Sequence, residues 1–343
     1  MHQVEAERQP KQLTPQMRGR TDAGAGKTVF AGIVDLGLGD DAVTIHSGNT
    51  AFGLVGVEHL NGSGQDNALT IQTNATGLAI NLGGGNDSVW LANGSNSVSV
   101  TDVENVNGSD FTGGITPSND TLELLNNVSG VTVNLGDGTN TLNLADGNNS
   151  FDALHGVNFV NGTSSSDTLT LNGYQGSVDL GGGTDTLNLN GGSFNLTVID
   201  VETINGSALQ DNLTISNTSG STTVTAGAGY DGITAGAGQD NFRFTSVSDS
   251  LVGGSADQIT NFDASSDTFT FSGIAIGDDH IEYVGTGAFA GSGQASAHLL
   301  NNGPGANVLQ IDIDGDGTMT SADMEIGLNN LNGTLSNSNF LLI

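Results

Sequence analysis

The sequence predicts an all-β protein, a parallel β-solenoid built from stacked repeats. Glycine makes up 53 of the 343 residues, about 15% and roughly double its usual share, whereas proline contributes only 4. One pattern recurs at intervals near 46 residues, and its apolar residues alternate with threonine and asparagine. Alternation with a period of two is typical of half-buried strands. Because one coil cannot bury its own apolar face, we expect the coils to stack.

The repeats are recognised by a turn that follows an apolar residue. Four copies begin at Val34, Ile80, Val133 and Val178 and read VDLGLGDDAVTI, INLGGGNDSVWL, VNLGDGTNTLNL and VDLGGGTDTLNL. The turn leucines, with Ala226 in a fifth copy, are separated by 46, 53, 45 and 46 residues, and the long interval contains an extra FTGGITP. A disordered acidic chain is the alternative, and regular apolar spacing over nearly 200 residues disfavours it when cations are present.

A second pattern lies between these copies and reads GVEHLNG, DVENVNG, GVNFVNG and DVETING. Each copy is followed by a polar turn and a short alternating run. The Asp and Asn residues that head the runs are separated alternately by about 26 and 20 residues. This alternation predicts two half-repeats in each 46-residue repeat, stacked as consecutive coils.

The charge of the chain restricts its partners. There are 37 Asp and Glu against 6 Lys and Arg, a formal net charge of −31, and five of the six basic residues lie in the first 27. Such a balance excludes ordinary binding to nucleic acid phosphates and argues against docking on an anionic membrane. It predicts a cationic partner, of which a divalent metal ion is the simplest. The absence of cysteine excludes disulfides and cysteine zinc sites, and no apolar run approaches the length of a membrane span.

The strongest metal-binding motif is a tandem nonapeptide, TAGAGYDGI followed by TAGAGQDNF, over residues 225–242. Glycine permits positive φ, which turns backbone carbonyls inward, and each aspartate adds a carboxylate. Ca²⁺ takes 6–8 oxygen ligands of these two kinds. The predicted ligand residues of the pair are Gly227, Gly229, Asp231, Gly236, Gly238 and Asp240.

Single loops of the same kind end at Asp41, Asp87 and Asp185, and we predict that these aspartates also bind calcium. The loop that ends at Asn140 lacks the carboxylate. In the single loops, glycine and aspartate residues that only form turns remain the alternative.

A different motif, DIDGDGTMTSAD, has the spacing of an EF-hand calcium loop. Its predicted ligands are the side chains of Asp312, Asp314, Asp316 and Asp323 and the carbonyl of Thr318. No good helix precedes the motif, so a paired EF-hand is not expected. A lone calcium loop and a plain acidic hairpin turn both remain open.

On the tandem nonapeptide, the chain resembles the RTX, or haemolysin-type calcium-binding repeat, family of type I secreted bacterial proteins. The tail strengthens the resemblance, because it contains FRFTSVSDS, GGSADQITNFDASSDTFTF, YVGTGAFAGSG, VLQIDIDGDG and NFLLI in that order. The resemblance implies a parallel β-roll with calcium between successive turns. It also implies a C-terminal β cap that carries an uncleaved secretion signal in about the last 60 residues, which would explain the lack of a conventional signal peptide at the start.

The resemblance adds a calcium ligand, Asp257, which lies 17 residues after Asp240 and so close to one 18-residue turn of such a roll. Asp263 and Asp267 are further candidates. The expected organisation is an N-terminal flexible segment over 1–30, four repeats over 31–220, and the nonapeptides with the capping and secretion module over 221–343. Residues 34–220 depart from nonapeptide spacing and look like the longer repeats of large surface proteins.

The expected function is a secreted, non-enzymatic calcium-binding repeat protein with a structural or adhesive role at or outside the cell. Its expected partners are calcium ions, the type I secretion machinery and a cell surface or extracellular polysaccharide. The alternative is a polysaccharide-modifying enzyme, a lyase or epimerase. No HExxH or Gly-x-Ser-x-Gly motif is present, so no catalytic residue is assigned. Glu58, Glu104 and Glu202 recur at one repeat position, with Asn158 in the third copy, and are interpreted as structural.

Overall fold

The computed structural model describes residues 33–36, 38–45, 48–108, 119–217, 219–274, 280–301 and 305–343. The N-terminal segment 1–30, the inserted FTGGITP and the turn residue Gly37 lie outside these described residues. The described residues form two compact units. The first extends to Ala145 and includes Phe151–Phe159, and the second comprises Asp146–Ser150 and Val160–Ile343. The domain boundary expected at residue 220 stays a prediction.

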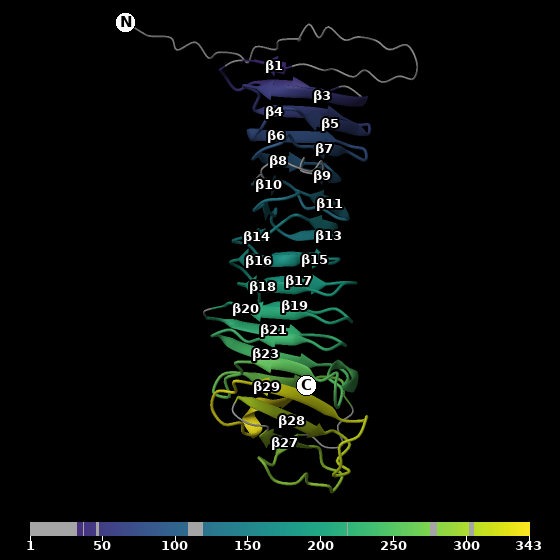
Figure 1. Ribbon diagram of the computed structural model, residues 1–343, viewed down its shortest axis with the longest axis vertical. Helices are drawn as coiled ribbons and strands as arrows, with labels where there is room; N and C mark the ends of the chain where they lie inside the picture. The colour runs from purple at the N-terminus through teal and green to yellow at the C-terminus, as the bar shows by residue number, and fades with distance from the viewer. Residues whose placement is uncertain are drawn as a thin grey trace, which may run out of the picture. The chain divides into compact units, whose positions relative to one another are not determined.

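In the first unit the chain alternates between two parallel sheets, and successive strands of each sheet lie one above the next (Figure 1). The sheet that contains β1 is called the odd sheet, and the sheet that contains β2 is called the even sheet. The odd sheet contains β1 (Ile33–Asp35), β3 (Gly48–Val55), β5 (Asn67–Ile71), β7 (Ser88–Trp90), β9 (Asn105–Asn107), β11 (Val131–Asn134) and β13 (Asn148–His155). The even sheet contains β2 (Ala42–Thr44), β4 (His59–Ser63), β6 (Thr76–Gly83), β8 (Ser97–Thr101), β10 (Thr121–Leu124) and β12 (Thr141–Asn143).

The second unit continues the same alternation. Its odd sheet contains β15 (Thr168–Leu171), β17 (Thr186–Leu189), β19 (Thr203–Asn205), β21 (Ser221–Thr225), β23 (Gln239–Phe244), β25 (Thr268–Phe271) and β30 (Phe340–Leu342). Its even sheet contains β14 (Phe159–Thr163), β16 (Gln175–Gly181), β18 (Asn195–Ile199), β20 (Asn212–Ile215), β22 (Gly232–Thr234) and β24 (Asp257–Thr260), followed by β29 (Met324–Asn329), β28 (Ala306–Asp312), β27 (Ser296–Asn301) and β26 (Glu282–Tyr283). Two short 3₁₀ helices, η1 (Val247–Asp249) and η2 (Asn337–Asn339), interrupt the strands.

The predicted parallel β-solenoid is confirmed, but the predicted length of its coil was wrong. A coil has two strands, and residues in register lie 17 apart (Ala42 and His59), 18 apart (Thr168 and Thr186) or 20 apart (Leu69 and Val89). The 20-residue interval is therefore one coil, whereas the 26-residue interval is a coil and a half. A period of two in the sequence marks strands, but it does not tell which sheet each strand joins.

A repeat of about 46 residues consequently contains five strands, or two and a half coils. The loops that end at residues 41, 87, 140, 185 and 231 precede β2, β7, β12, β17 and β22, which are five strands apart. Equivalent loops therefore alternate between the even and the odd sheet.

The core consists of the apolar residues that point inward from each strand. The turn leucines Leu82, Leu135 and Leu180 are fully buried, and each strand adds one or two buried Leu, Val or Ile residues. Outward positions carry partly exposed threonine and asparagine, as the alternation predicts. Replacing one such leucine with alanine typically costs about 2–5 kcal/mol of stability.

The predicted C-terminal β cap is also present. β27, β28 and β29 form an antiparallel group that joins the even sheet through β24. On the odd sheet, β30 pairs with β25, and Phe340 packs on Phe269 with ring centroids 5.7 Å apart. Within the terminal NFLLI, Phe340 is therefore buried in the cap, whereas Leu341 and Ile343 are exposed.

Candidate metal centre

The G-x-G-x-D loops place an aspartate where the coil turns into a strand. In the second unit Asp231 precedes β22 and Asp257 begins β24. The N–H of Asp211 donates to Asp231 Oδ1 at 2.8 Å, and the N–H of Asp231 donates to Asp257 Oδ1 at 2.9 Å. On the odd sheet the N–H of Asp240 donates to Asp267 Oδ1 at 3.0 Å. One oxygen of each carboxylate thus caps the backbone of the neighbouring coil.

Asp231, Asp257 and Asp240 each have one oxygen that is buried without a hydrogen-bond partner; the hydrogen-bonded oxygen of Asp240 accepts the N–H of Gly236 in its own loop at 2.7 Å. The three atoms are Asp231 Oδ2, Asp257 Oδ2 and Asp240 Oδ1, and their residues are at most 2% exposed. A buried polar group without a partner costs about 1–3 kcal/mol, and a charged one costs more. A cation supplies the partner that such an oxygen lacks, so these aspartates fit a bound metal ion.

Two aspartates of the intervening loops, Asp211 and Asp167, are different, because both of their oxygens accept hydrogen bonds. Asp211 accepts from the N–H of Phe194 and from the N–H of Ser207. Asp167 accepts from the N–H of Gly147 and from the N–H of Thr163. The unpartnered oxygen therefore occurs in the G-x-G-x-D loops and at Asp257, and not at every buried aspartate in the solenoid.

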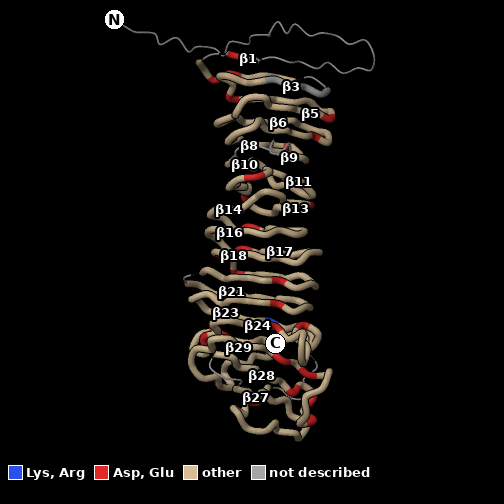
Figure 2. The backbone as a smooth tube through the Cα atoms, in the orientation of Figure 1, with Lys and Arg blue, Asp and Glu red and all other residues tan. Residues whose placement is uncertain are grey.

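Among the described residues, no Lys or Arg side chain neutralises these buried carboxylates. Asp and Glu recur along both units, whereas Arg243 is the one Lys or Arg among the described residues (Figure 2). The Arg243 guanidinium donates to Ser272 Oγ at 3.0 Å and not to a carboxylate.

Burial raises the pKa of the three aspartates that carry an unpartnered oxygen. The pKa of Asp231 rises to about 7, that of Asp240 to about 6 and that of Asp257 to about 8. Desolvation is the largest cause in each case, and neighbouring carboxylates add to it. The sites are therefore poorly suited to negative charge unless a cation is present.

Sequence reasoning missed one carboxylate of this cluster, Asp249 in η1. Its negative charge contributes to the raised pKa of both Asp231 and Asp257. Asp249 is buried, and its Oδ2 accepts from the N–H groups of Thr245 and Ser246. The signal that could have found it is the S-x-x-D capping box that begins at Ser246.

The tandem nonapeptides do not form one site. Nine residues are half a coil, so Asp231 lies on the even sheet and Asp240 on the odd sheet. The expectation that Asp257 lies one turn after Asp240 was also wrong. Asp257 stacks on Asp231, 26 residues away, and Asp267 stacks on Asp240, 27 residues away, because residues 245–256 with η1 lengthen this coil.

The expected positive φ holds for only half of the tandem glycines. Gly227 and Gly229 have φ of +95° and +148°. Gly236 and Gly238 do not adopt positive φ. They are required instead by close packing of coils, since a Cβ on Gly238 would overlap the carbonyl oxygen of Gly220.

The single loops repeat the arrangement of the tandem pair. The Oδ2 atoms of Asp41, Asp87 and Asp185 are buried without a hydrogen-bond partner. Among the weaker candidates, Asp267 has both oxygens occupied by N–H donors, and Asp263 accepts from Ser265 and Asn332.

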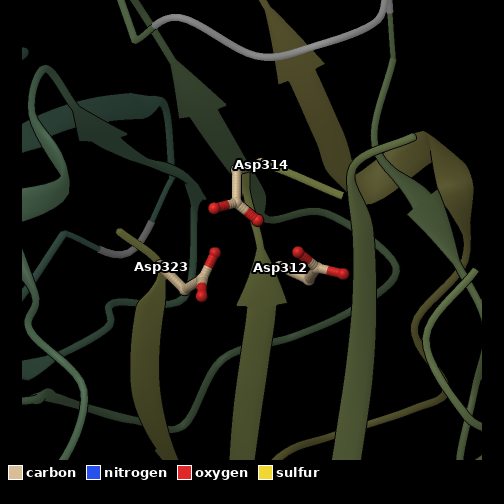
Figure 3. Close-up of side chains that lie close together, drawn as sticks. All are labelled: Asp312, Asp314 and Asp323. Atoms are coloured by element: carbon tan, nitrogen blue, oxygen red, sulfur yellow. The ribbon is translucent and has the colours of Figure 1, made fainter. Parts of the chain in front are cut away.

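The EF-hand-like motif forms the hairpin loop between the antiparallel strands β28 and β29. Asp312, Asp314 and Asp323 face one another, with ligand oxygens within 4.8 Å (Figure 3). Asp312 and Asp323 are fully buried and Asp314 is exposed. The other two predicted ligand residues, Asp316 and Thr318, are hydrogen-bonded to each other. Asp316 Oδ1 accepts from the N–H and from the hydroxyl of Thr318.

We expect Asp312→Ala to destabilise this hairpin and to remove one bound calcium ion. Asp312 accepts from the N–H groups of Gly315 and Gly317, and each buried donor left unpaired costs about 1–3 kcal/mol. Thermal unfolding and calcium stoichiometry, with exposed Asp146→Asn as the control, measure the two effects. An equal loss of stability with and without calcium, at unchanged stoichiometry, would identify a purely acidic hairpin.

A comparison with known protein families finds one family that matches this chain. The family described as peptidase M10 serralysin C terminal matches residues 139–341, more than half of the chain. The chain belongs to this family. The match covers the tandem nonapeptides, the cap and the hairpin loop, which confirms the resemblance to RTX-type β-roll modules.

Among solved structures, the chain is similar to the solution structure of the AlgE6R3 subunit from the Azotobacter vinelandii mannuronan C5-epimerase. The two are 23% identical, over 52% of this chain and 80% of that one, with a TM-score of 0.24. No curated protein matches the chain. In the described ranges, no helix has the length and apolar character needed to span a bilayer.

Proposed function

We propose that this chain is a secreted calcium-binding β-roll protein without catalytic activity, which folds when it meets calcium outside the cell. The observation that carries the proposal is the set of buried, unpartnered carboxylate oxygens in the G-x-G-x-D loops. Ca²⁺ is a hard cation that takes oxygen ligands, and the loops offer carboxylates and backbone carbonyls. Membership of the serralysin C-terminal family supports the same conclusion.

In this proposal Asp231, Asp240 and Asp257 hold calcium at the corners of successive coils. Bound calcium neutralises their charge and satisfies the oxygens that lack a donor. The other oxygen of Asp231 and of Asp257 continues to accept an N–H from the neighbouring coil, so ion binding and coil stacking depend on the same side chains. Folding and calcium binding are therefore linked.

The outward faces of the sheets suit a structural or adhesive role. Thr168, Thr186 and Thr203 lie in register on successive strands of the odd sheet, and Asn188 lies beside Asn205 in the next row. Such rows present uncharged hydroxyl and amide groups, which are suited to a cell surface or an extracellular polysaccharide. Lyase and epimerase assays on acidic polysaccharides test the enzymatic alternative.

Export is tested by expressing the full chain in a Gram-negative host together with a type I exporter. We expect the chain to appear in the medium, and to become protease-resistant there only when millimolar calcium is present. The control is secretion of the exporter's own native substrate by the same cells. If that substrate is secreted and this chain stays inside the cells, the extracellular assignment is overturned.

A further inference from the structure

The third repeat contains a direct substitute for a cation. Asn140 Oδ1 accepts the N–H of Asp120 at 2.7 Å. Asn140 Nδ2 donates to the carbonyl oxygen of Gly156 at 2.6 Å and lies 3.4 and 3.5 Å from those of Gly136 and Leu135. Three backbone carbonyls therefore converge on a positively polarised NH₂ group at this corner.

In the second and fourth repeats an aspartate occupies the place of this asparagine. Asp87 Oδ1 accepts the N–H of Asn67 at 2.6 Å, and Asp185 Oδ1 accepts the N–H of Asp167 at 2.7 Å. The second oxygen of each aspartate thus stands where Asn140 has its NH₂ group. Both aspartates are 0% exposed, and these second oxygens have no hydrogen-bond partner.

Two backbone positions beside this place adopt similar positive φ in the three repeats. The turn glycines Gly83, Gly136 and Gly181 have φ of +86°, +77° and +85°. In the following turn Asp102 has φ of +51°, Gly156 of +63° and Asp200 of +48°. Turns with similar φ therefore surround an NH₂ group in the third repeat and an unpartnered carboxylate oxygen in the second and fourth.

The glutamates at the recurrent repeat position belong to the same corners. The N–H of Asp87 donates to Glu104 Oε2 at 2.7 Å, and the N–H of Asp185 donates to Glu202 Oε2 at 2.7 Å. In the third repeat Asn158 Oδ1 accepts the N–H of Asn140, also at 2.7 Å. A neutral amide therefore suffices as the acceptor, and the structural role explains an oxygen at this position but not a negative charge.

From the second to the fourth repeat three positions change their charge together, whereas the first repeat has Asp41 and Glu58 with Gly56 at the middle position. The second repeat has Asp87, Asp102 and Glu104, the fourth has Asp185, Asp200 and Glu202, and the third has Asn140, Gly156 and Asn158. Asp102 and Asp200 adopt left-handed backbone, in which glycine is the less strained residue. Both are exposed and stand near enough to Asp87 and Asp185 respectively to repel their charge. Clustered carboxylates at a strained position are unfavourable in a chain of net charge −31 unless a cation offsets them.

We propose that the second and fourth repeats each bind one Ca²⁺ between the G-x-G-x-D loop and the D-V-E turn that follows it, and that the Asn140 amide replaces this ion in the third repeat. Asp87 with Glu104, and Asp185 with Glu202, supply the carboxylate ligands. Asp102 and Asp200 add negative charge at the mouth of each site. This inference rests on the calcium-binding role proposed above, and it assigns a ligand set that combines two different motifs.

The test exchanges the residues of one repeat for those of another in the full chain. The triple variant Asp185→Asn/Asp200→Gly/Glu202→Asn gives the fourth repeat the side chains of the third. Equilibrium dialysis against calcium is expected to show one ion fewer per chain, with an unchanged circular dichroism spectrum at saturation. Asp137→Asn/Asp146→Asn/Asp152→Asn removes the same charge from exposed positions and is expected to leave the stoichiometry unchanged.

The reverse exchange keeps the test decisive if the first variant does not fold. Asn140→Asp/Gly156→Asp/Asn158→Glu is expected to gain one calcium ion per chain. If both triple variants fold and bind the same number of calcium ions as the unmodified chain, the inference is overturned. The proposed function still stands in that case, because the unmodified chain binds calcium. If the unmodified chain binds no calcium, the proposed function itself fails.

Discussion

Removal of calcium is expected to unfold most of this chain near neutral pH. Buried aspartates whose second oxygen has no hydrogen-bond partner lie in both units, and no Lys or Arg within the described ranges neutralises them. They include Asp41, Asp87, Asp185, Asp231, Asp240 and Asp257. A net charge of −31 also opposes compaction. Each bound Ca²⁺ removes two negative charges, and its binding energy adds to folding stability. Far-ultraviolet circular dichroism should show a β spectrum at about 1 mM Ca²⁺, the order at which extracellular modules bind it, and a largely unfolded chain after chelation.

Two controls separate calcium binding from general screening of charge. Sodium chloride at equal ionic strength should not restore the β spectrum. Asp231→Asn/Asp240→Asn should raise the calcium midpoint and lower its cooperativity, whereas Asp137→Asn/Asp152→Asn removes two exposed charges and should leave both unchanged. A β spectrum that survives complete removal of calcium would contradict this expectation.

The solenoid itself was predictable from sequence because its core repeats a simple rule. Leu169, Leu171, Leu187 and Leu189 alternate with polar residues, and each is buried in β15 or β17. The assignment of strands to sheets was not predictable in the same way. Five strands per repeat give the same local pattern as four or six, and only the pairing of coils reveals that equivalent loops change sheet.

The candidate site was predictable where one residue type marks it and not where partners come from another coil. The G-x-G-x-D loops identified Asp87 and Asp231, whose second oxygens lack partners. The partners of these aspartates depend on coil length, and the insertion with η1 moved Asp257 from Asp240 to Asp231. Glu104 was interpreted as structural because it recurs, and the structure gives it that role without explaining its charge.

Acid is expected to replace calcium in part as the condition for folding. In the unfolded chain an aspartate titrates near its ordinary pKa of 3.8, whereas burial raises the pKa of Asp240 to about 6, Asp231 to about 7 and Asp257 to about 8. The folded state therefore binds protons more tightly than the unfolded state. Without calcium, these groups destabilise the fold above pH 8, and this penalty is lost progressively as the pH falls from about 8 toward 4.

With calcium present the dependence on pH takes the opposite sign. Protons compete with Ca²⁺ for the same carboxylates, so the calcium midpoint should rise as the pH falls from 8 to 5. Circular dichroism between pH 8 and 5 measures both trends, and calcium is removed by dialysis because chelators weaken in acid. Asp231→Asn/Asp257→Asn should flatten the calcium-free trend, since the two most strongly shifted groups no longer titrate. Ordinary surface carboxylates titrate near pH 4, so a gain of β structure above pH 5 reports the buried aspartates. A calcium-free chain that loses structure steadily from pH 8 to 5 would show that these carboxylates are not buried without a cation.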